Sequence, residues 1–171
     1  MTQSKILALY KPNSKNTGHA CSFSQSPKDG TIYSSLIKQS SWNDVKKIGS
    51  FANSRNDVTK NVSIKLSQVE VAAILDCLER NRPYSTLHDS DKQQKSIQFI
   101  PWINKPMNEG EKPVQKGFSF SISVTDKQDS TTKNAFYIGI NFAEGRLIRA
   151  YLDNALKKSF ENAEVVESEG I

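Results

Sequence analysis

Residues 62–75, with the sequence VSIKLSQVEVAAIL, constrain the fold more than any other stretch, because a strand pattern there runs directly into a helix pattern. Val62, Ile64 and Leu66 alternate with polar residues, which is the period of a strand with one buried face. From Val71 onward, apolar residues recur at spacings of three and four, which is the period of an amphipathic helix. The stretch therefore predicts a domain in which a half-buried strand leads straight into a helix.

The junction between the two patterns carries the signals of a helix start. Ser67 is a preferred N-cap residue and Glu70 stands three positions later, so the pair can form a capping box that satisfies two backbone N–H groups. Leu66 and Val71 flank this cap as a hydrophobic staple. Asn81, shortly before a proline, predicts the end of the helix. These residues are expected to build structure, and we assign no ligand to them.

Alternating patterns predict further strands on both sides of this helix. Residues 117–125 (GFSFSISVT) show the clearest alternation, with large apolar side chains on one face and serines on the other. Residues 40–60 and 104–116 are rich in polar and turn-forming residues and are predicted to be irregular. Pro101 predicts the end of a strand or a sheet edge. The expected strands are residues 5–10, 20–25, 31–39, 61–66, 96–102, 117–125 and 135–140, and a second helix is expected from residue 143.

This order of elements predicts an α+β fold of two curved antiparallel β-sheet motifs, each followed by a helix, in a ββββ-α repeat. Because the strands alternate, one face of each sheet is expected to be buried and the other to be free for a ligand. The length of 171 residues suits one domain, which we expect over residues 1–158. Residues 159–171 are expected to form an acidic, flexible C-terminal tail.

The charge is distributed unevenly along the chain. The net charge is +5, yet residues 1–60 alone carry +6, and residues 159–171 carry four glutamates and no cation. Without that segment the rest of the chain has a net charge of +9. A basic domain of this kind attracts polyanions, and a mobile acidic tail would compete for the same surface. The charge pattern alone leaves open whether the lysines bind a nucleic acid or only solvate the fold.

No combination of residues in the sequence predicts an enzyme. His88 lies among carboxylates, but the only other histidine is His19, and neither has the neighbours of a metal site. The glycine-rich phosphate loops and the G-x-S-x-G nucleophile elbow are also missing. We therefore expect no catalytic residue, no metal and no cofactor. His88 is expected in a loop or at a helix cap.

The cysteine and hydropathy patterns predict an intracellular protein. Cys21 and Cys77 lack C-x-x-C spacing and are expected to be buried free thiols in a reducing compartment. No apolar run approaches the ~20 residues of a membrane helix, and the N-terminus lacks the cleavage site of a signal peptide. We expect the cytoplasm or nucleoid, or the host cytoplasm if the chain is encoded by a phage, which its Asn-, Ser- and Lys-rich composition would suit.

Cations and flat side chains in the strands predict a nucleic-acid interface. Binding a single strand requires cations that follow the phosphates and rings on which unstacked bases can lie. Serines on the free sheet faces could hydrogen-bond phosphates or bases. Lys65 is expected to point away from the buried Ile64 and Leu66. The candidate binding residues are Tyr33, Lys38, Trp42, Lys46, Lys47, Lys65, Lys95, Trp102 and Tyr137.

The run from Val62 to Leu156 resembles the Whirly proteins and the related positive-coactivator fold that binds single-stranded DNA. The segments that carry the resemblance are LSQVE at residues 66–70, LHD at 87–89, KSIQFIP at 95–101, the strand at 118–124 and FAE at 142–144. The N-terminal third matches only as strands and a hairpin. The lysine-glycine-lysine-alanine strand motif of plant Whirly proteins is not found here, so its DNA contact is not carried over.

The resemblance implies a single-stranded-DNA-binding protein that is largely sequence-independent and acts in DNA replication, recombination or transcription. It also implies a homodimer or a multiple of one, packed through the helices with DNA held across the sheets. The acidic tail would suit the recruitment of replication or transcription proteins. The alternative is an RNA-binding or protein-interaction module on the same scaffold, with residues 104–116 and the tail as contact sites.

Overall fold

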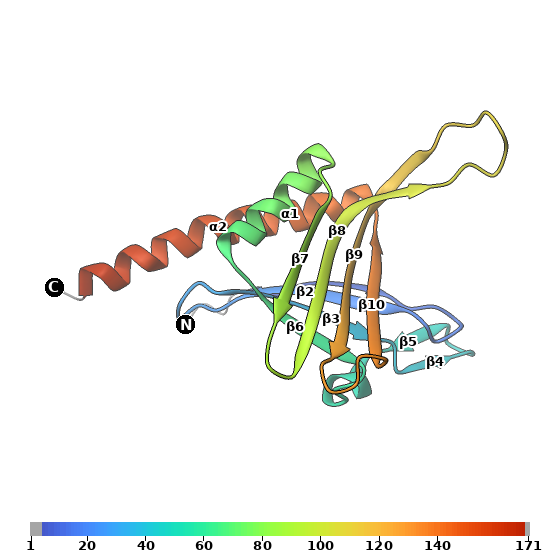
Figure 1. Ribbon diagram of the computed structural model, residues 1–171, viewed down its shortest axis with the longest axis horizontal. Coiled ribbons are helices and arrows are strands. Elements are labelled where there is room, and N and C mark those ends of the chain that lie inside the picture. Colours follow the sequence, from blue (N-terminus) through green and yellow to red (C-terminus); the bar gives the residue numbers. More distant parts are fainter. Residues whose placement is uncertain (1–4, 170–171) are drawn as a thin grey trace.

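The computed structural model describes residues 5–169, and it describes residues 162–169 as helical backbone only. Two four-stranded antiparallel sheets cross one another, and each is followed in the chain by one helix (Figure 1). The predicted α+β fold with a ββββ-α repeat is confirmed. None of the helices within residues 5–169 is long and apolar enough to cross a bilayer.

Each half of the chain contributes four strands of one sheet followed by a helix, and the first half has β4, β5 and η1 in addition. The first half comprises β1 (Leu7–Lys11), β2 (His19–Gln25), β3 (Ile32–Lys38), β4 (Ser41–Asn43), β5 (Ile48–Ser50), the 3-10 helix η1 (Ala52–Asn56), β6 (Asn61–Leu66) and α1 (Gln68–Arg80). The second half comprises β7 (Tyr84–Asp89), β8 (Gln93–Asn104), β9 (Val114–Asp126), β10 (Lys133–Ile140) and α2 (Phe142–Glu169). The first sheet has the order β1-β2-β3-β6 and the second has the order β10-β9-β8-β7, while β4 and β5 form a separate hairpin.

Three segments contain more strand than the sequence analysis predicts. Residues 84–89 form β7, where half-buried Tyr84, Thr86 and His88 face inward while Leu87 is exposed, so the usual apolar alternation is inverted. Residues 40–60 are not wholly irregular, because they hold the very short β4 and β5 and the helix η1. The predicted loop at residues 104–116 is shorter than expected, since β8 continues to Asn104 and β9 begins at Val114.

Pro101 lies inside β8, opposite Phe118 of β9, so it does not end the strand. The pairing of β7 with β8 stops at Phe99, and beyond that residue β8 has β9 as its partner in the sheet. Pro101 therefore occupies a stretch in which β8 has become an edge. A residue without an N–H is tolerated there because no second neighbouring strand needs that donor.

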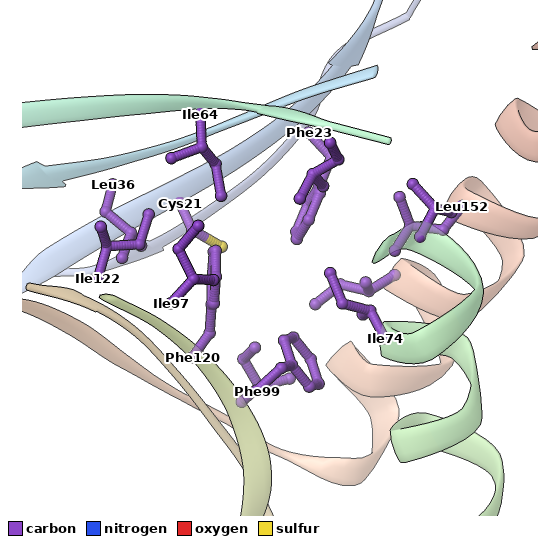
Figure 2. Packing of buried hydrophobic residues seen from close by; sticks show 14 of the residues in the cluster. Cys21, Phe23, Leu36, Ile64, Ile74, Ile97, Phe99, Phe120, Ile122 and Leu152 are labelled. Carbon is purple, nitrogen blue, oxygen red and sulfur yellow. The ribbon is translucent and has the colours of Figure 1, made fainter. Parts of the chain in front are cut away.

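The hydrophobic core fills the space between the two sheets and is closed by the helices (Figure 2). Phe23 of the first sheet stacks on Phe120 of the second at 6.0 Å between ring centroids. Ile74 of α1 and Leu152 of α2 reach the same cluster and are fully buried. Cys21 and Cys77 are buried free thiols, as predicted. Because the inner faces of both sheets face this core, the outer faces remain available.

The start of α1 has the predicted capping box. The Ser67 hydroxyl accepts a hydrogen bond from the Glu70 backbone N–H at 3.2 Å, and Glu70 Oε1 accepts one from the Ser67 N–H at 3.0 Å. Asn81 ends the helix in the left-handed conformation, with φ of 58°. His88 lies neither in a loop nor directly at the cap. It lies in β7, and its Nε2 contacts Glu70 Oε2 at 2.6 Å, so it supports the cap through that carboxylate.

The helix α2 begins with a second capping pair and extends into the predicted tail. Asn141 Oδ1 accepts from the Glu144 N–H at 2.8 Å, and Glu144 Oε1 accepts from the Asn141 N–H at 3.0 Å. Residues 159–169 continue the helical backbone, and the buried Ser159 hydroxyl accepts a hydrogen bond from Gln68 of α1. The side chains of residues 162–171 lie outside the described residues. A domain over residues 1–158 with a flexible tail stays a prediction.

Candidate nucleic-acid interface

The strand register of the second sheet places polar side chains in rows on the face that points away from the core. Gln98 of β8, Ser121 of β9 and Tyr137 of β10 are direct cross-strand neighbours in one row. The rows on either side hold serines, small residues and two aliphatic side chains. Of the outward-facing side chains in the regularly paired part of these strands, which excludes the bulge at Lys116, the charged ones, Asp89 and Lys133, lie at one end of the sheet. This second-sheet outer face is therefore polar and uncharged at its centre.

Trp102 lies flat against the second-sheet outer face because Gly139 of β10 has no side chain. A Cβ atom at Gly139 would lie only 2.9 Å from Cζ3 of the Trp102 ring. The ring is 43% exposed, so its other side is open to solvent. A β-bulge between Trp102 and Ile103 shifts the pairing of β8 with β9 at this point. Bulges re-aim side chains, and here the bulge follows directly after the exposed ring.

Tyr137 lies on the same face and is 58% exposed. Its ring centroid is 4.6 Å from that of His19 at the start of β2, because the edge strand β10 packs beside the first sheet. Lys38, at the end of β3, donates a hydrogen bond to Asn134 Oδ1 at 2.5 Å and lies 4.8 Å from the centroid of the Phe136 ring. Tyr137 thus stands where an uncharged sheet face meets a basic side chain.

Tyr33 and Lys65 form a second, smaller group on the outer face of the first sheet. They are direct cross-strand partners on β3 and β6, and both are exposed. The prediction that Lys65 points away from the core is confirmed. In the next row of the same two strands, the hydroxyls of Ser35 and Ser63 are 2.7 Å apart. The outer face of the first sheet therefore also combines serines with an aromatic ring, Tyr33, and it carries a cation, Lys65.

Trp42, Lys46 and Lys47 lie together on the β4–β5 hairpin, away from both sheet faces (Figure 1). The indole N–H of Trp42 donates to Asp44 Oδ1 at 3.1 Å, which fixes the half-buried ring. Lys47 adopts φ of 54° and its Nζ is 3.7 Å from the same carboxylate. Lys46 is exposed at the hairpin tip. This hairpin follows β3 directly, so it rises from the same end of the sheet as Lys38.

Lys95 lies apart from the other candidates. It is on the inner side of β8, in line with the buried Ile97, and its Nζ donates to the backbone carbonyl of Ser63 at 2.9 Å. It lines a cleft of about 310 Å³ between the sheets, together with Asn61, Asn134 and other residues. Its charge therefore lies at a sheet junction and not on an outer face.

Sequence reasoning missed three residues that shape the interface, namely Gly139, His19 and Lys60. Gly139 supports Trp102, and only its alignment opposite Ser119 reveals that role. His19 and Lys60 line a second cleft of about 340 Å³ beside Tyr137. Burial and then the charge of Lys38 lower the pKa of His19 to about 4, against a weaker opposing effect of a hydrogen bond to the Thr17 backbone. No local spacing signals this cleft, because four separate segments of the chain line it.

Comparison with known proteins identifies the family. The family model described as Whirly transcription factor matches residues 11–151. The chain belongs to the Whirly family. The match begins well before Val62, so the first sheet also belongs to the Whirly domain, although its short motifs do not reveal it. No curated protein sequence matches the chain at a significant level.

Solved structures show the same Whirly fold at low sequence identity. WHY1 from Arabidopsis thaliana has 16% identity and a TM-score of 0.62, over 91% of this chain and 90% of that chain. The plant transcriptional regulator PBF-2 has 14% identity and a TM-score of 0.64, over 98% of this chain and 88% of that one. The MRP1/MRP2 structure from Trypanosoma brucei has 15% identity and a TM-score of 0.56, over 94% and 88%.

Proposed function

We propose that this Whirly protein binds single-stranded DNA with little base preference and acts in DNA replication, recombination or transcription. The observation that carries the proposal is the pair of exposed rings, Trp102 and Tyr137, on one uncharged polar sheet face. Such rings stack on any unpaired base, since every base has a π-face, whereas a duplex keeps those faces inside its own stack. The family description as a transcription factor also favours a nucleic-acid ligand.

The cations around this face supply the phosphate contacts in the proposal. Lys38 lies beside Tyr137, and Lys46 and Lys47 extend from the adjacent hairpin. Neutralising phosphates releases counterions, so these lysines would make binding sensitive to salt. Trp42 and Tyr33 are proposed as further stacking rings. Lys65 is proposed as the phosphate contact of the first sheet, and Lys95 as a contribution from the sheet junction.

Assembly through the helices is a further part of the proposal. Leu147 and Phe160 of α2 are more than half exposed, as is Val69 of α1, so the helical layer presents apolar side chains to solvent. Burying them against a second copy would stabilise a homodimer or a multiple of one. We propose that the acidic tail contacts replication or transcription proteins. A solution mass measured with and without single-stranded DNA tests the assembly, and a monomer in both conditions would contradict it.

Fluorescence anisotropy with labelled oligonucleotides tests the ligand. A single strand, its duplex and an RNA of matched sequence are titrated at several salt concentrations. We expect the single-stranded DNA to bind more tightly than the duplex, with an affinity that falls steeply with salt. Equal or tighter binding to the duplex, or no binding at low salt, would overturn the proposal. Preferential binding of the RNA would make this an RNA-binding module, and a partner retained after nuclease treatment would favour a protein-interaction module.

Two pairs of adjacent lysines provide a matched control for the salt effect. Changing Lys46 and Lys47 to glutamine removes two charges from the hairpin, and changing Lys157 and Lys158 removes two from the exposed surface of α2. Both double variants have the same net charge. The hairpin variant should lower the affinity and the slope of log affinity against log salt, whereas the α2 variant should change neither. Equal effects would show that net charge alone drives binding.

A further inference from the structure

We infer that a cleft on the outer face of the first sheet is a second base-binding subsite, in which an unstacked base contacts the rings of Tyr10 and Phe51 and its phosphate contacts Arg55. The inference rests on the proposed binding of single-stranded DNA and places a further contact on the other sheet. The cleft has a volume of about 540 Å³, within the range of sites that hold small molecules. All three side chains line it.

Tyr10 is an exposed aromatic side chain at one end of the first sheet. In the strand register it pairs with Ala20 of β2, which in turn pairs with Ile37 of β3. Ile37 lies four residues from Tyr33 on the same strand, so Tyr10 and Tyr33 belong to the same outer face. Tyr10 is 54% exposed, and its ring centroid is 5.7 Å from that of the buried Phe51. A base that enters the cleft therefore meets aromatic surface from both rings.

A second wall of the cleft comes from the β4–β5 hairpin, which is held against the turn between β1 and β2. Gly49 of β5 approaches Pro12 so closely that a Cβ atom at this position would lie 2.4 Å from the Pro12 Cβ. The buried Gln39 side chain accepts from two backbone N–H groups of the turn and donates to the carbonyls of Asn13 and Ser41. These contacts fix the wall in place, so binding has little loop ordering left to impose.

Arg55 supplies the charge of this cleft, and the sheet fixes its backbone. The Asn61 amide of β6 donates to three backbone carbonyls in and just after η1, that of Arg55 among them, which holds η1 on the outer face. The Arg55 side chain is exposed and forms no ion pair with any residue that the structure describes. The nearby Asp57 carboxylate accepts hydrogen bonds from Thr59 instead. The guanidinium is therefore available to an anionic ligand such as a phosphate.

The surface between this cleft and Tyr33 suits a strand of nucleic acid. Tyr10 and Tyr33 are four residues apart along the strands and two strands apart, which corresponds to roughly 16 Å. At the ~3.4 Å spacing of a stacked strand, about five nucleotides cover this span, and fewer do when the strand is extended. A ring and a cation stand at each end, Arg55 beside Tyr10 and Lys65 beside Tyr33, which matches the alternation of bases and phosphates. The row between the two ends is uncharged and small: Ala8, Ser22, Ser35 and Ser63.

Photocrosslinking tests the contact on the wild-type protein. Oligo-dT in which 5-iodouracil replaces one thymine at a time is bound to the full chain at low salt and irradiated, and the crosslinked peptides are identified by mass spectrometry. Because this base crosslinks to aromatic rings that it stacks on, we expect adducts on Tyr10 or Phe51 in addition to the second-sheet outer face. Adducts confined to Trp102 and Tyr137 would overturn the subsite and leave the proposed function intact. Failure to bind any oligonucleotide would instead refute the proposed function.

Two substitutions separate the ring from the cation, and Arg146 provides a matched control. Tyr10→Leu keeps an apolar contact with Phe51 and loses the ring, so it should weaken binding of single-stranded DNA roughly 5- to 150-fold, the range of one stacked base. Arg55→Gln should flatten the plot of log affinity against log salt by about 0.7, the value for one phosphate of a single strand. Arg146→Gln removes the same charge from the exposed surface of α2 and should leave the slope unchanged.

Two results with these variants would overturn the inference. The first is wild-type affinity in Tyr10→Leu together with a wild-type slope in Arg55→Gln. The second is a changed solution mass of Tyr10→Leu with unchanged affinity for DNA, which would make the cleft a contact between copies of the chain. Crosslinking on the wild type decides the question if Tyr10→Leu fails to fold.

Discussion

Replacing Trp102 with leucine tests whether the second-sheet outer face stacks on bases. One side of the indole lies on Gly139 and the ring is 43% exposed, so one ring face is free for a single base. Stacking on an aromatic side chain contributes about 1–3 kcal/mol per base, judged by alanine substitution. At 1.4 kcal/mol for each factor of ten, the loss corresponds to roughly 5- to 150-fold weaker binding of single-stranded DNA. Leucine keeps an apolar cover over Gly139, so the fold should remain stable.

A second substitution, at Gly139, displaces the same ring from the side that lies on the sheet. Alanine at Gly139 would place its Cβ 2.9, 3.3 and 3.4 Å from Cζ3, Cε3 and Cη2 of Trp102. The ring must move outward, because the Cβ atom is fixed to the strand and the ring is the end of a flexible side chain. We expect Gly139→Ala to weaken binding by a smaller factor than Trp102→Leu. Combined, the two changes should be less than additive, since both act on one ring.

Anisotropy of a labelled oligonucleotide measures the affinity of every variant, and tryptophan fluorescence reports on the Trp102 ring in the variants that keep it. The chain has two tryptophans, so Trp42→Phe leaves Trp102 as the single reporter. Adding an unlabelled oligonucleotide should quench this emission, and the titration yields the affinity. The reasoning would be refuted if Trp102→Leu melted like the wild type and still bound within roughly twofold of it, a difference of about 0.4 kcal/mol. Absence of quenching at saturating DNA would refute it independently.

Two further predictions concern the helix cap and the tail. Glu70→Ala removes the capping carboxylate and its contact with His88, and should lower stability by about 2–3 kcal/mol in chemical denaturation. Burial alone would raise the pKa of Glu70, but hydrogen bonds from Ser67 and His88 outweigh it and lower the pKa. The stabilisation of the fold by the Glu70 carboxylate is therefore complete above the ordinary carboxyl pKa and is lost as pH falls through the lowered pKa. Glu70→Gln keeps a capping acceptor that does not titrate, so this variant should not show the acid-dependent loss of stability. Deleting residues 162–171, which include three glutamates, should tighten DNA binding at low salt, and unchanged affinity would exclude autoinhibition by the tail.

The elements that could be predicted from sequence are those whose local pattern and tertiary environment agree. The sequence of β6 has the period of a strand, and α1 begins with a capping box and continues with the period of a helix. The structure has the strand, the cap and the helix where these signals predict them. The strand β9 alternates between core and serine face along most of its length. In contrast, β7 exposes Leu87 and half-buries polar side chains, so its sequence pattern does not predict a strand. The strand forms because its backbone pairs with β8. Tertiary pairing overrides propensity there.

The candidate site could be predicted by residue type but not by arrangement. Trp102 and Tyr137 could be named from the sequence as rings near polar residues. That they share one face depends on the register of β8, β9 and β10, and the access of Trp102 depends on a glycine two strands away. Lys95 has the composition of a phosphate contact, yet it lies on the inner side of β8 and donates to a carbonyl. His19 lacked any local signal, because it meets Tyr137 only through the packing of β10 beside the first sheet.

The separation of rings from cations determines how this surface would respond to salt. Stacking on Trp102 and Tyr137 buries π-faces and releases no counterions, so that part of the affinity should persist at high ionic strength. The lysines lie beside the face or on the β4–β5 hairpin, and only their phosphate contacts should weaken as salt rises. In plots of log affinity against log salt, Trp102→Leu should therefore change the intercept, whereas the hairpin lysine variant should change the slope. The first should shift down with an unchanged slope, and the second should become flatter.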